Sequence, residues 1–263
     1  MTTEGTKIPW KVFCNVYDMP DSPTGPLKYG ESVVKMCRIK ELTDAEYPLI
    51  LTNSTIRDIE QLDVSTVEDF TEVFFTVINT NFDLSGWDVG KGKIFEHMFY
   101  SAYVFNSNLS SWNVGNGENF KNMFRNANNF ESDLSTWDVS NGENFERMFT
   151  YAIKFNSSLS YWNVSKGTDF SSVFDNAWGF NSDLSMWNVE NGENFKNMFT
   201  DAKVFNSDLS SWNVSKGTDF TSIFEGATAF KSGDNVHSVA DWDVCGAVGN
   251  YNTTLFTKNC SSR

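Results

Sequence analysis

A segment of 25 residues recurs with a fixed step through most of this chain. Complete copies begin at Trp87, Trp112, Trp137, Trp162, Trp187 and Trp212, with a weaker first copy at Leu62 and a partial last copy at Trp242. One interruption, of roughly five residues around 233–237, falls in the seventh unit, and insertions of this kind are placed in loops. A strict period of this length is typical of proteins whose repeats stack on one another.

The apolar pattern changes its period within each unit. Trp112 and Val114 lie two apart around a polar residue, which predicts a short strand with one buried face. Residues 120–127 then place Phe, Met, Phe and Ala at i, i+3, i+4 and i+7, which predicts a short helix. Gly117 precedes this stripe, and we expect it and its equivalents to take a positive φ at the corner. The predicted fold class is an α/β repeat solenoid with one very short parallel strand and one short helix in each unit.

Stacking would place each repeated apolar residue over its equivalent in the next unit. Three such ladders consist of Phe, and they start at Phe95, Phe99 and Phe105. Burying a large apolar side chain contributes roughly 1.5 to 3 kcal/mol, so about five such side chains fall short of the ordering entropy of one unit. Neighbours on both sides are needed to complete the core, and this disfavours a chain of independent small domains.

The repeated motifs resemble those of a known family. The run WDVSNGENFERMF, from Trp137 to Phe149, and the A-x-x-F-N and D-L-S-x-W motifs of other copies resemble the 25-residue DUF285 repeat of BspA-like, mycoplasma-type leucine-rich repeat surface proteins. The resemblance covers residues 62–244. It implies a right-handed coil related to leucine-rich repeats, and a surface, adhesion or interaction role rather than catalysis. The family usually has Val where this chain has the Gly of SNGENF, and Met where it has the first Phe; only the opening copy keeps Val67.

A stack of repeats needs covers at both ends, because open ends expose apolar side chains and unpaired strand edges. We therefore divide the chain into an N-terminal cap at 1–61, a seven-unit solenoid at 62–241 and a C-terminal cap at 242–263. The cysteines all lie in these caps, at Cys14, Cys37, Cys245 and Cys260. This placement predicts the disulfides Cys14–Cys37 and Cys245–Cys260, although other pairings are formally possible and four reduced, buried thiols are the alternative.

Charge and hydropathy exclude several classes of protein. The chain has 34 Asp and Glu against 20 Lys and Arg, and its net charge of −14 disfavours binding to nucleic acid. No apolar run approaches the eighteen or so residues that a transmembrane helix needs. Residues 1–10 contain neither an apolar signal core nor a cleavage site, so an extracellular or cell-surface location requires a mature or partial chain. The cysteines and the family resemblance favour that location.

Two sets of polar residues are candidate surface sites. N-x-S/T sequons would suit a secreted glycoprotein, although a chain rich in Asn and Ser produces several by chance. These sequons begin at Asn53, Asn108, Asn156, Asn163, Asn213, Asn252 and Asn259. The second set is an outward row beside the Trp ladder, which could hold Ca²⁺ through oxygen ligands but is interrupted by amides, so a solvated face is favoured. This interaction row consists of Asp63, Asp88, Asn113, Asp138, Asn163, Asn188, Asn213 and Asp243.

No group of residues predicts catalysis. His97 and His237 occupy different repeat positions, which disfavours a paired acid and base, and no CxxC pair or His cluster marks a zinc site. We expect no cofactor and no enzymatic activity. The leading hypothesis is an extracellular structural or adhesive repeat protein that acts through its exposed solenoid faces on a protein, a glycan or further copies of itself. The alternative is a glycan- or calcium-binding recognition module.

Overall fold

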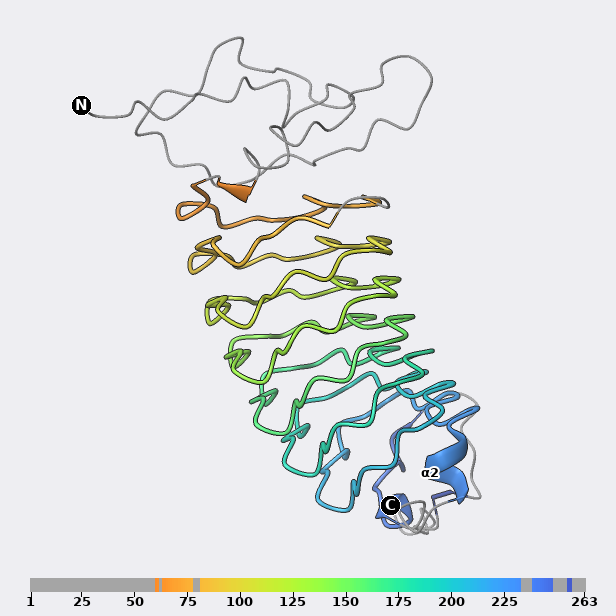
Figure 1. The fold of residues 1–263 in the computed structure, drawn as a ribbon. Helices are drawn as coiled ribbons and strands as arrows, with labels where there is room; N and C mark the ends of the chain where they lie inside the picture. The colour runs from red at the N-terminus through yellow and green to blue at the C-terminus, as the bar shows by residue number, and fades with distance from the viewer. Residues whose placement is uncertain (1–59, 62, 78–80, 233–237, 248–254, 257–263) are drawn as a thin grey trace, which may run out of the picture.

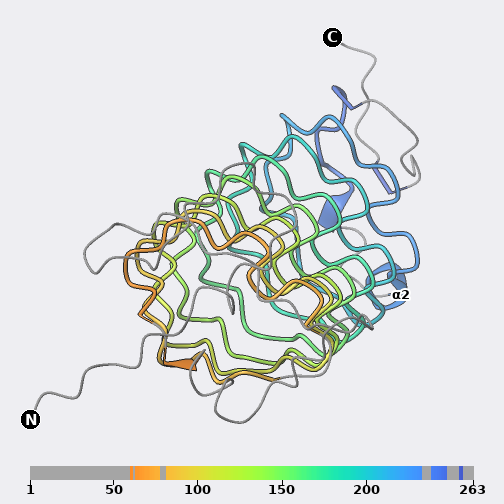
Figure 2. The ribbon, with the colours of Figure 1, turned by 90° about the horizontal axis from the view of Figure 1, so that it is seen from above.

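The chain forms a stack of coils. The structure is a computed structural model, and it describes residues 60–61, 63–77, 81–232, 238–247 and 255–256. Successive 25-residue units lie one above the other, with the first units at one end and the last at the other (Figure 1). Seen along the stack, the coils overlie one another (Figure 2). Most of the two predicted caps lies outside the described residues, and their boundaries stay predictions.

The predicted ladders of aromatic side chains are present. Trp137, Trp162 and Trp187 stack with near-parallel rings whose centroids are 6.4 and 6.5 Å apart. The Phe ladders run beside them; the rings of Phe124 and Phe149, for example, stack at 5.7 Å. All these side chains belong to one continuous hydrophobic core of the described residues. Each coil therefore covers the apolar face of the next, which a single unit cannot do for itself.

The helix predicted in each unit is wrong, because a run of turns takes its place. Every second N–H group of this run donates to a carbonyl of the next coil; the N–H of Phe124, for example, donates to Met148 O at 2.9 Å. The donors are Phe120, Asn122, Phe124 and Asn126. The alternate residues donate three residues back within the coil, as in Met123 N to Phe120 O at 3.1 Å. Asn122 and Asn126 have φ of 55° and 61°, which a right-handed helix does not allow. The bonds that a helix would close within one coil instead join neighbouring coils. Among the described residues, the named helix is α2 (Thr228–Ser232), in the seventh unit.

The predicted strand is also displaced. Trp112 and Val114 are buried on either side of exposed Asn113, as expected, but their backbone forms no ladder. Parallel bridges instead occur one corner later, at Asp69, Ile94, Asn119, Asn144, Asp169, Asn194 and Asp219. Side chains of the next coil bond to the backbone N–H and C=O groups near Trp. These groups therefore have partners although no strand pairing occurs there.

Leucine, serine and tryptophan form this side-chain connection. The buried N–H of Leu134 donates to Ser157 Oγ of the next coil at 2.8 Å. The carbonyl of Leu134 accepts a bond from Trp162 Nε1, also of the next coil, at 2.9 Å. The same pair of contacts recurs along the stack. Because buried peptide groups must find partners, this repeated set explains why Leu, Ser and Trp recur at fixed spacing.

The repeated glycine before each Phe has a steric role, and the predicted positive φ is wrong. Among the described glycines, positive φ occurs at Gly226, which is not a corner glycine. A Cβ built on Gly142 would lie 2.4 Å from Phe145 Cζ, and the equivalent glycines are equally crowded. The Phe145 ring is held by stacked rings at 5.7 Å on both sides. In the first described coil, where Val67 replaces the glycine, Phe70 stacks in parallel on a described ring of one neighbouring coil, Phe95.

The substitution Gly142→Ala is expected to destabilise the fold by about 1–3 kcal/mol, because the added methyl group overpacks a ring that cannot move aside. The measurement is the midpoint of urea unfolding followed by circular dichroism. Gly86→Ala is the matched control, since no atom lies within 4 Å of the Cβ built there, and it should change stability by less than about 0.5 kcal/mol. Equal losses in both variants would contradict the steric role.

Candidate functional site

The predicted interaction row lies on the surface and closes a turn in each coil. The Oδ1 atom of Asp138 accepts a hydrogen bond from the N–H of Ser140 at 3.0 Å, and Asn188 accepts one from Glu190 at 3.1 Å. All eight members make this contact with the residue two positions later. These are Asx turns, a structural use of the side chain. In the part of the chain that the structure describes, no three His, Cys, Asp or Glu side chains are grouped as metal ligands would be.

The predicted modification sites are only partly described. Four sequons have exposed asparagines, at Asn108, Asn156, Asn163 and Asn213. The sequons at Asn53, Asn252 and Asn259 lie outside the described residues, and so does His237. Cys245 is disulfide-bonded, whereas Cys14, Cys37 and Cys260 lie outside the described residues, so both proposed pairings stay predictions. Within the described ranges, no helix has the length and hydrophobicity needed to cross a bilayer.

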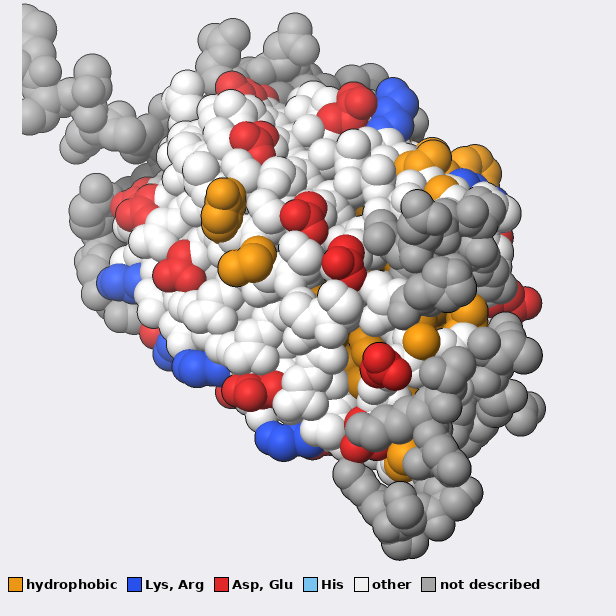
Figure 3. All heavy atoms as spheres, turned by 90° about the horizontal axis from the view of Figure 1, so that it is seen from below, with side chains coloured by type: hydrophobic (Ala, Val, Ile, Leu, Met, Phe, Trp, Pro, Cys, Tyr) orange, Lys and Arg blue, Asp and Glu red, His pale blue; other side chains and the backbone are white. Residues whose placement is uncertain are grey.

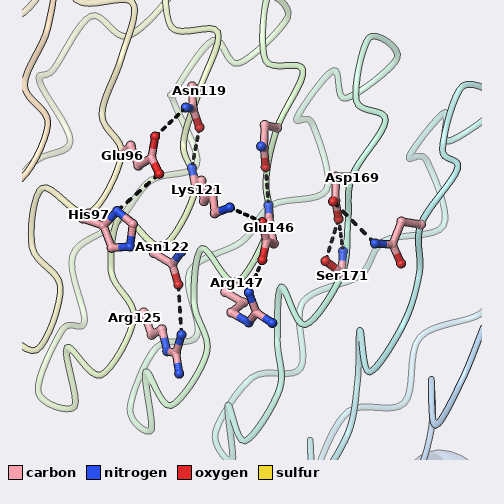
Figure 4. Close-up of polar contacts among 12 residues, drawn as sticks. Glu96, His97, Asn119, Lys121, Asn122, Arg125, Glu146, Arg147, Asp169 and Ser171 are labelled. Carbon is pink, nitrogen blue, oxygen red and sulfur yellow. Dashed lines mark hydrogen bonds and ion pairs between the residues drawn. The ribbon is translucent and has the colours of Figure 1, made fainter. Parts of the chain in front are cut away.

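The run of turns carries a network of charged side chains on its outer side (Figure 4). Glu146 is the centre of this network. It accepts contacts from Lys121 of the preceding coil, at 2.6 Å, and from its neighbour Arg147. Its side chain is 14% exposed, so the two cations compensate a largely buried carboxylate. The ion pair between Lys121 and Glu146 joins adjacent coils, which is a structural role.

His97 lies among aromatic rings in an earlier coil of the same face. Its ring centroid is 5.4 Å from that of Tyr100, which stacks on Phe75 at 4.7 Å. Arg125 lies over Tyr100, 5.5 Å from the ring centroid. Burial lowers the pKa of His97, and the nearby carboxylate of Glu96 opposes this shift. His97 is thus half-buried in a packed cluster, and the second histidine is not described.

Asp175 is a half-buried carboxyl on this face, and it gives the stack a dependence on pH. Burial raises the pKa of Asp175, against the effect of a 2.7 Å hydrogen bond from Asn176 Nδ2. The folded state therefore binds this proton more tightly than the unfolded state, and stability falls as pH rises through the raised pKa. The variant Asp175→Asn should gain stability relative to the parent as pH rises from about 3.5 to 7.

Asp133→Asn is the control of opposite sign for this measurement. The backbone and side chain of Ser135 donate to Asp133 and lower the pKa of its carboxyl, so Asp133 contributes stability that is lost as pH falls. The asparagine variant should therefore lose stability relative to the parent as pH rises. Urea midpoints measured across the pH range test both signs, and a difference from the parent that stays constant for Asp175→Asn would contradict the first.

A different side of the stack, which we call the acidic face, carries only negative charge. It contains eight Asp or Glu residues and no Lys or Arg. The acidic face is formed by the outward side chains of segments 81–90, 106–115, 131–140, 156–165, 181–190 and 206–215. The space-filling view shows a mostly uncharged polar surface with scattered acidic side chains and two adjoining hydrophobic ones near its middle, with Lys and Arg along the edges and further hydrophobic side chains to the right (Figure 3). This face suits a neutral or cationic partner better than an anionic one.

Two exposed hydrophobic side chains and a shallow groove lie on the acidic face. Tyr161 and Met186 hold the same position in adjacent coils and are 88% and 74% exposed. The lining of the groove includes Ser185, which is next to Met186 in sequence, and the groove has a volume of about 360 Å³. It is lined by Asn181, Ser182, Asp183, Ser185, Asn206, Ser207 and Asp208. The sequence alone does not predict this groove, although the N-S-D-L-S motif that builds it recurs at 181–185 and 206–210.

The repeats match a family model that is described as "Mycoplasma protein of unknown function, DUF285". The matched residues are 45–153 and 119–237, which together span most of the chain. The chain belongs to the DUF285 family. No curated protein matches it.

Within this DUF285 chain, the copies of the repeat have nearly the same buried residues, whereas their exposed residues differ. The buried Trp, Leu and Phe ladders are nearly invariant from coil to coil. By contrast, one outer position reads Tyr103, Asn128, Ile153, Trp178 and Lys203 in successive coils. Trp178 is 46% exposed there, on a protein whose other described Trp side chains are buried. The core positions are fixed by packing, whereas these outer positions are not.

Proposed function

We propose that this DUF285 chain is a right-handed, leucine-rich-repeat-like solenoid that acts without catalysis as an adhesive or structural protein at the cell exterior. The observation that carries the proposal is the contrast between a repeated core and varied exposed residues. A rigid stack can present different side chains at fixed spacing, which is how other repeat proteins make extended binding surfaces. The resemblance of the repeat to that of BspA-like surface proteins supports the same role.

Exposed aromatic and apolar side chains are the residues through which the stack would bind. Tyr103, Tyr151 and Trp178 are each between 42% and 46% exposed, at positions that hold Asn in at least one other unit. Tyr and Trp are the residues most often found at the energetic centres of binding interfaces. Their exposure here has no role in the core, so it favours contact with a partner or with another copy of the chain.

Beads coated with the purified chain test this proposal. They should be retained on cultured cell layers, on matrix-coated glass or on polysaccharide-coated glass more strongly than albumin-coated beads. A variant with Tyr103→Asn, Tyr151→Asn and Trp178→Asn should show weaker retention with an unchanged urea midpoint. Retention equal to albumin on all three surfaces would overturn the adhesive role. Light scattering over a range of concentrations tests the self-assembling version, for which the apparent mass should rise with concentration.

A glycan-binding module is the second candidate, and the polar groove favours it. A ladder of Trp rings could stack on sugar rings only if it were exposed, and the described Trp ladder is buried, so the groove and not the ladder supports this candidate. Calcium binding receives no comparable support, because among the described residues no three His, Cys, Asp or Glu side chains are grouped as metal ligands would be.

A further inference from the structure

The residue before the repeated Trp differs between coils. It is Ser or Thr in three coils, Tyr161 and Met186 in the two coils between them, and Gly86 and Asp241 in the end coils. In three coils, its hydroxyl donates to a carbonyl of the preceding coil: Ser111 to Ser85 O at 3.0 Å, Thr136 to Ser110 O at 2.9 Å, and Ser211 to Ser185 O. Tyr161 and Met186 occupy this position in the two coils between, and neither has such a bond. These coils therefore lose a structural hydrogen bond and expose large apolar side chains instead.

Adjoining large hydrophobic side chains that are this exposed are typical of binding surfaces. Tyr161 and Met186 are the two most exposed large hydrophobic side chains among the described residues. They are also neighbours, because Trp162 and Trp187, which follow them, stack at 6.5 Å. A tyrosine ring presents a flat apolar face and a polar hydroxyl, a combination that suits the alternating C–H and O–H groups of a sugar ring.

The groove beside them offers the matching hydrogen-bonding groups. Its lining consists of Asn, Ser and Asp side chains, which both donate to and accept from hydroxyl groups. Asp183 Oδ1 is used by Ser185 N and Ser207 Oγ, which holds the carboxylate in a fixed orientation. Asp208 is held in the same way by Ser210 N at 2.9 Å. The second oxygen of each carboxylate takes part in none of these bonds and is available to a ligand.

Distance permits one ligand to use both features. Met186 follows Asp183 by three residues, so their Cα atoms lie within about 11 Å of each other. Tyr161 holds the same position in the adjacent coil, where the rings of the following Trp162 and Trp187 are 6.5 Å apart. The groove volume of about 360 Å³ is at the small end of the range for ligand sites. An oligosaccharide of a few rings could place one ring in the groove and the next against Met186 and Tyr161.

Charge decides which oligosaccharides are suitable. The acidic face has no Lys or Arg to receive a sulfate, phosphate or carboxylate group, and its eight acidic residues repel such groups. Neutral sugars avoid this repulsion, and amino sugars with an ammonium group are attracted by Asp183 and Asp208. A cationic protein would match the charge as well, but the small hydrogen-bonding groove favours a ligand rich in hydroxyl groups.

We propose that Tyr161, Met186 and the groove from Asn181 to Asp208 form a binding site for a neutral or amino-sugar oligosaccharide. This inference rests on the proposed binding role and names the ligand class for one site. The sugar ring packs against the tyrosine, and its hydroxyl or ammonium groups donate to the two aspartates. The sequons at Asn156 and Asn163 lie on the same face, so the protein for testing is made in a host that adds no N-glycans.

Calorimetric titration with defined oligosaccharides tests the site. The probes are β-glucan, chitin and chitosan oligosaccharides, with heparin oligosaccharides as the anionic comparison. We expect at least one of the first three to bind and heparin not to bind. The double variant Tyr161→Ser, Met186→Ser restores the residue found in other coils, and it should raise Kd by at least about tenfold without lowering the urea midpoint.

A matched control removes apolar surface elsewhere. Val104→Asn, Val204→Asn changes two exposed residues that lie outside the segments of the acidic face, and it should leave the Kd for the sugar unchanged. Asp183→Asn, Asp208→Asn should weaken amino-sugar binding more than neutral-sugar binding. Binding of none of the sugars, or binding that the double serine variant does not weaken, would overturn the inference. If the sugars fail to bind but the serine variant loses bead retention, the patch contacts a protein and the adhesive role stands without the glycan site.

Discussion

Replacing Trp162 with alanine is expected to destabilise the stack by about 3–5 kcal/mol. Trp162 is 3% exposed and stacks between Trp137 and Trp187. Its loss opens a cavity at the centre of the ladder and leaves the carbonyl of Leu134 without the Trp162 Nε1 bond. Both neighbouring coils depend on this ring, so the effect combines damage to two interfaces between coils. The measurement is urea unfolding followed by circular dichroism.

Trp178→Ala is the matched control for this prediction. It makes the same chemical change at a side chain that is 46% exposed and bonded only to Asn176, at 3.3 Å. We expect this variant to lose less than about 1 kcal/mol. Trp162→Phe separates the two contributions, because it keeps a ring in the ladder and removes the hydrogen bond. Similar losses for the two alanine variants would show that the stacked Trp rings do not support the core.

Deleting one whole unit is expected to leave a shorter but native-like stack, whereas deleting half a unit is expected to abolish it. Removal of residues 150–174 takes out one period of 25 residues and joins Phe149 to Asp175, which follows Phe174 as Thr150 follows Phe149. Every later residue then keeps its ladder. The free energy of unfolding should fall only by the contribution of one coil and of one interface between coils.

Removal of residues 150–161 provides the contrasting variant. It leaves one coil about half a turn short, so the ladders before and after it cannot be joined. This variant should bind a hydrophobic dye and lose cooperative urea unfolding, although fewer residues have been removed. Circular dichroism and dye fluorescence distinguish the two outcomes. Cooperative unfolding of the half-unit variant, or collapse of the whole-unit variant, would contradict the proposed solenoid.

The core could be predicted from sequence because its period is strict. Any closed coil of 25 residues that repeats its Trp and Phe positions must bring equivalent residues together, whatever local backbone joins them. The local backbone could not be predicted in the same way. Phe120, Met123, Phe124 and Ala127 have helical spacing, but a run of turns buries the same four side chains. The turns prevail because Asn122 and Asn126 adopt positive φ and direct alternate N–H groups to the next coil.

The candidate site could be predicted only in part. The exposed row of Asp and Asn was expected, and its Asx turns follow from the recurrent small or polar residue two positions later. The groove depends on how two coils face each other, which no single unit reveals. The sequence shows Tyr161 and Met186 at a position that is Ser or Thr in other coils. Only the structure shows that those hydroxyl groups bond to the preceding coil, and that Tyr161 and Met186 replace this bond with exposed apolar surface.

The alternate N–H groups that join each coil to the next all point along the stack, and this determines how the molecule bears tension. A pull on its two ends loads the bonds of one junction at a time rather than all together. Coils would therefore peel away singly, each releasing about 80 to 90 Å of extended chain. An attachment made of such units would lengthen in equal steps under load and absorb energy at each step, so a tethered surface would yield gradually before it detached.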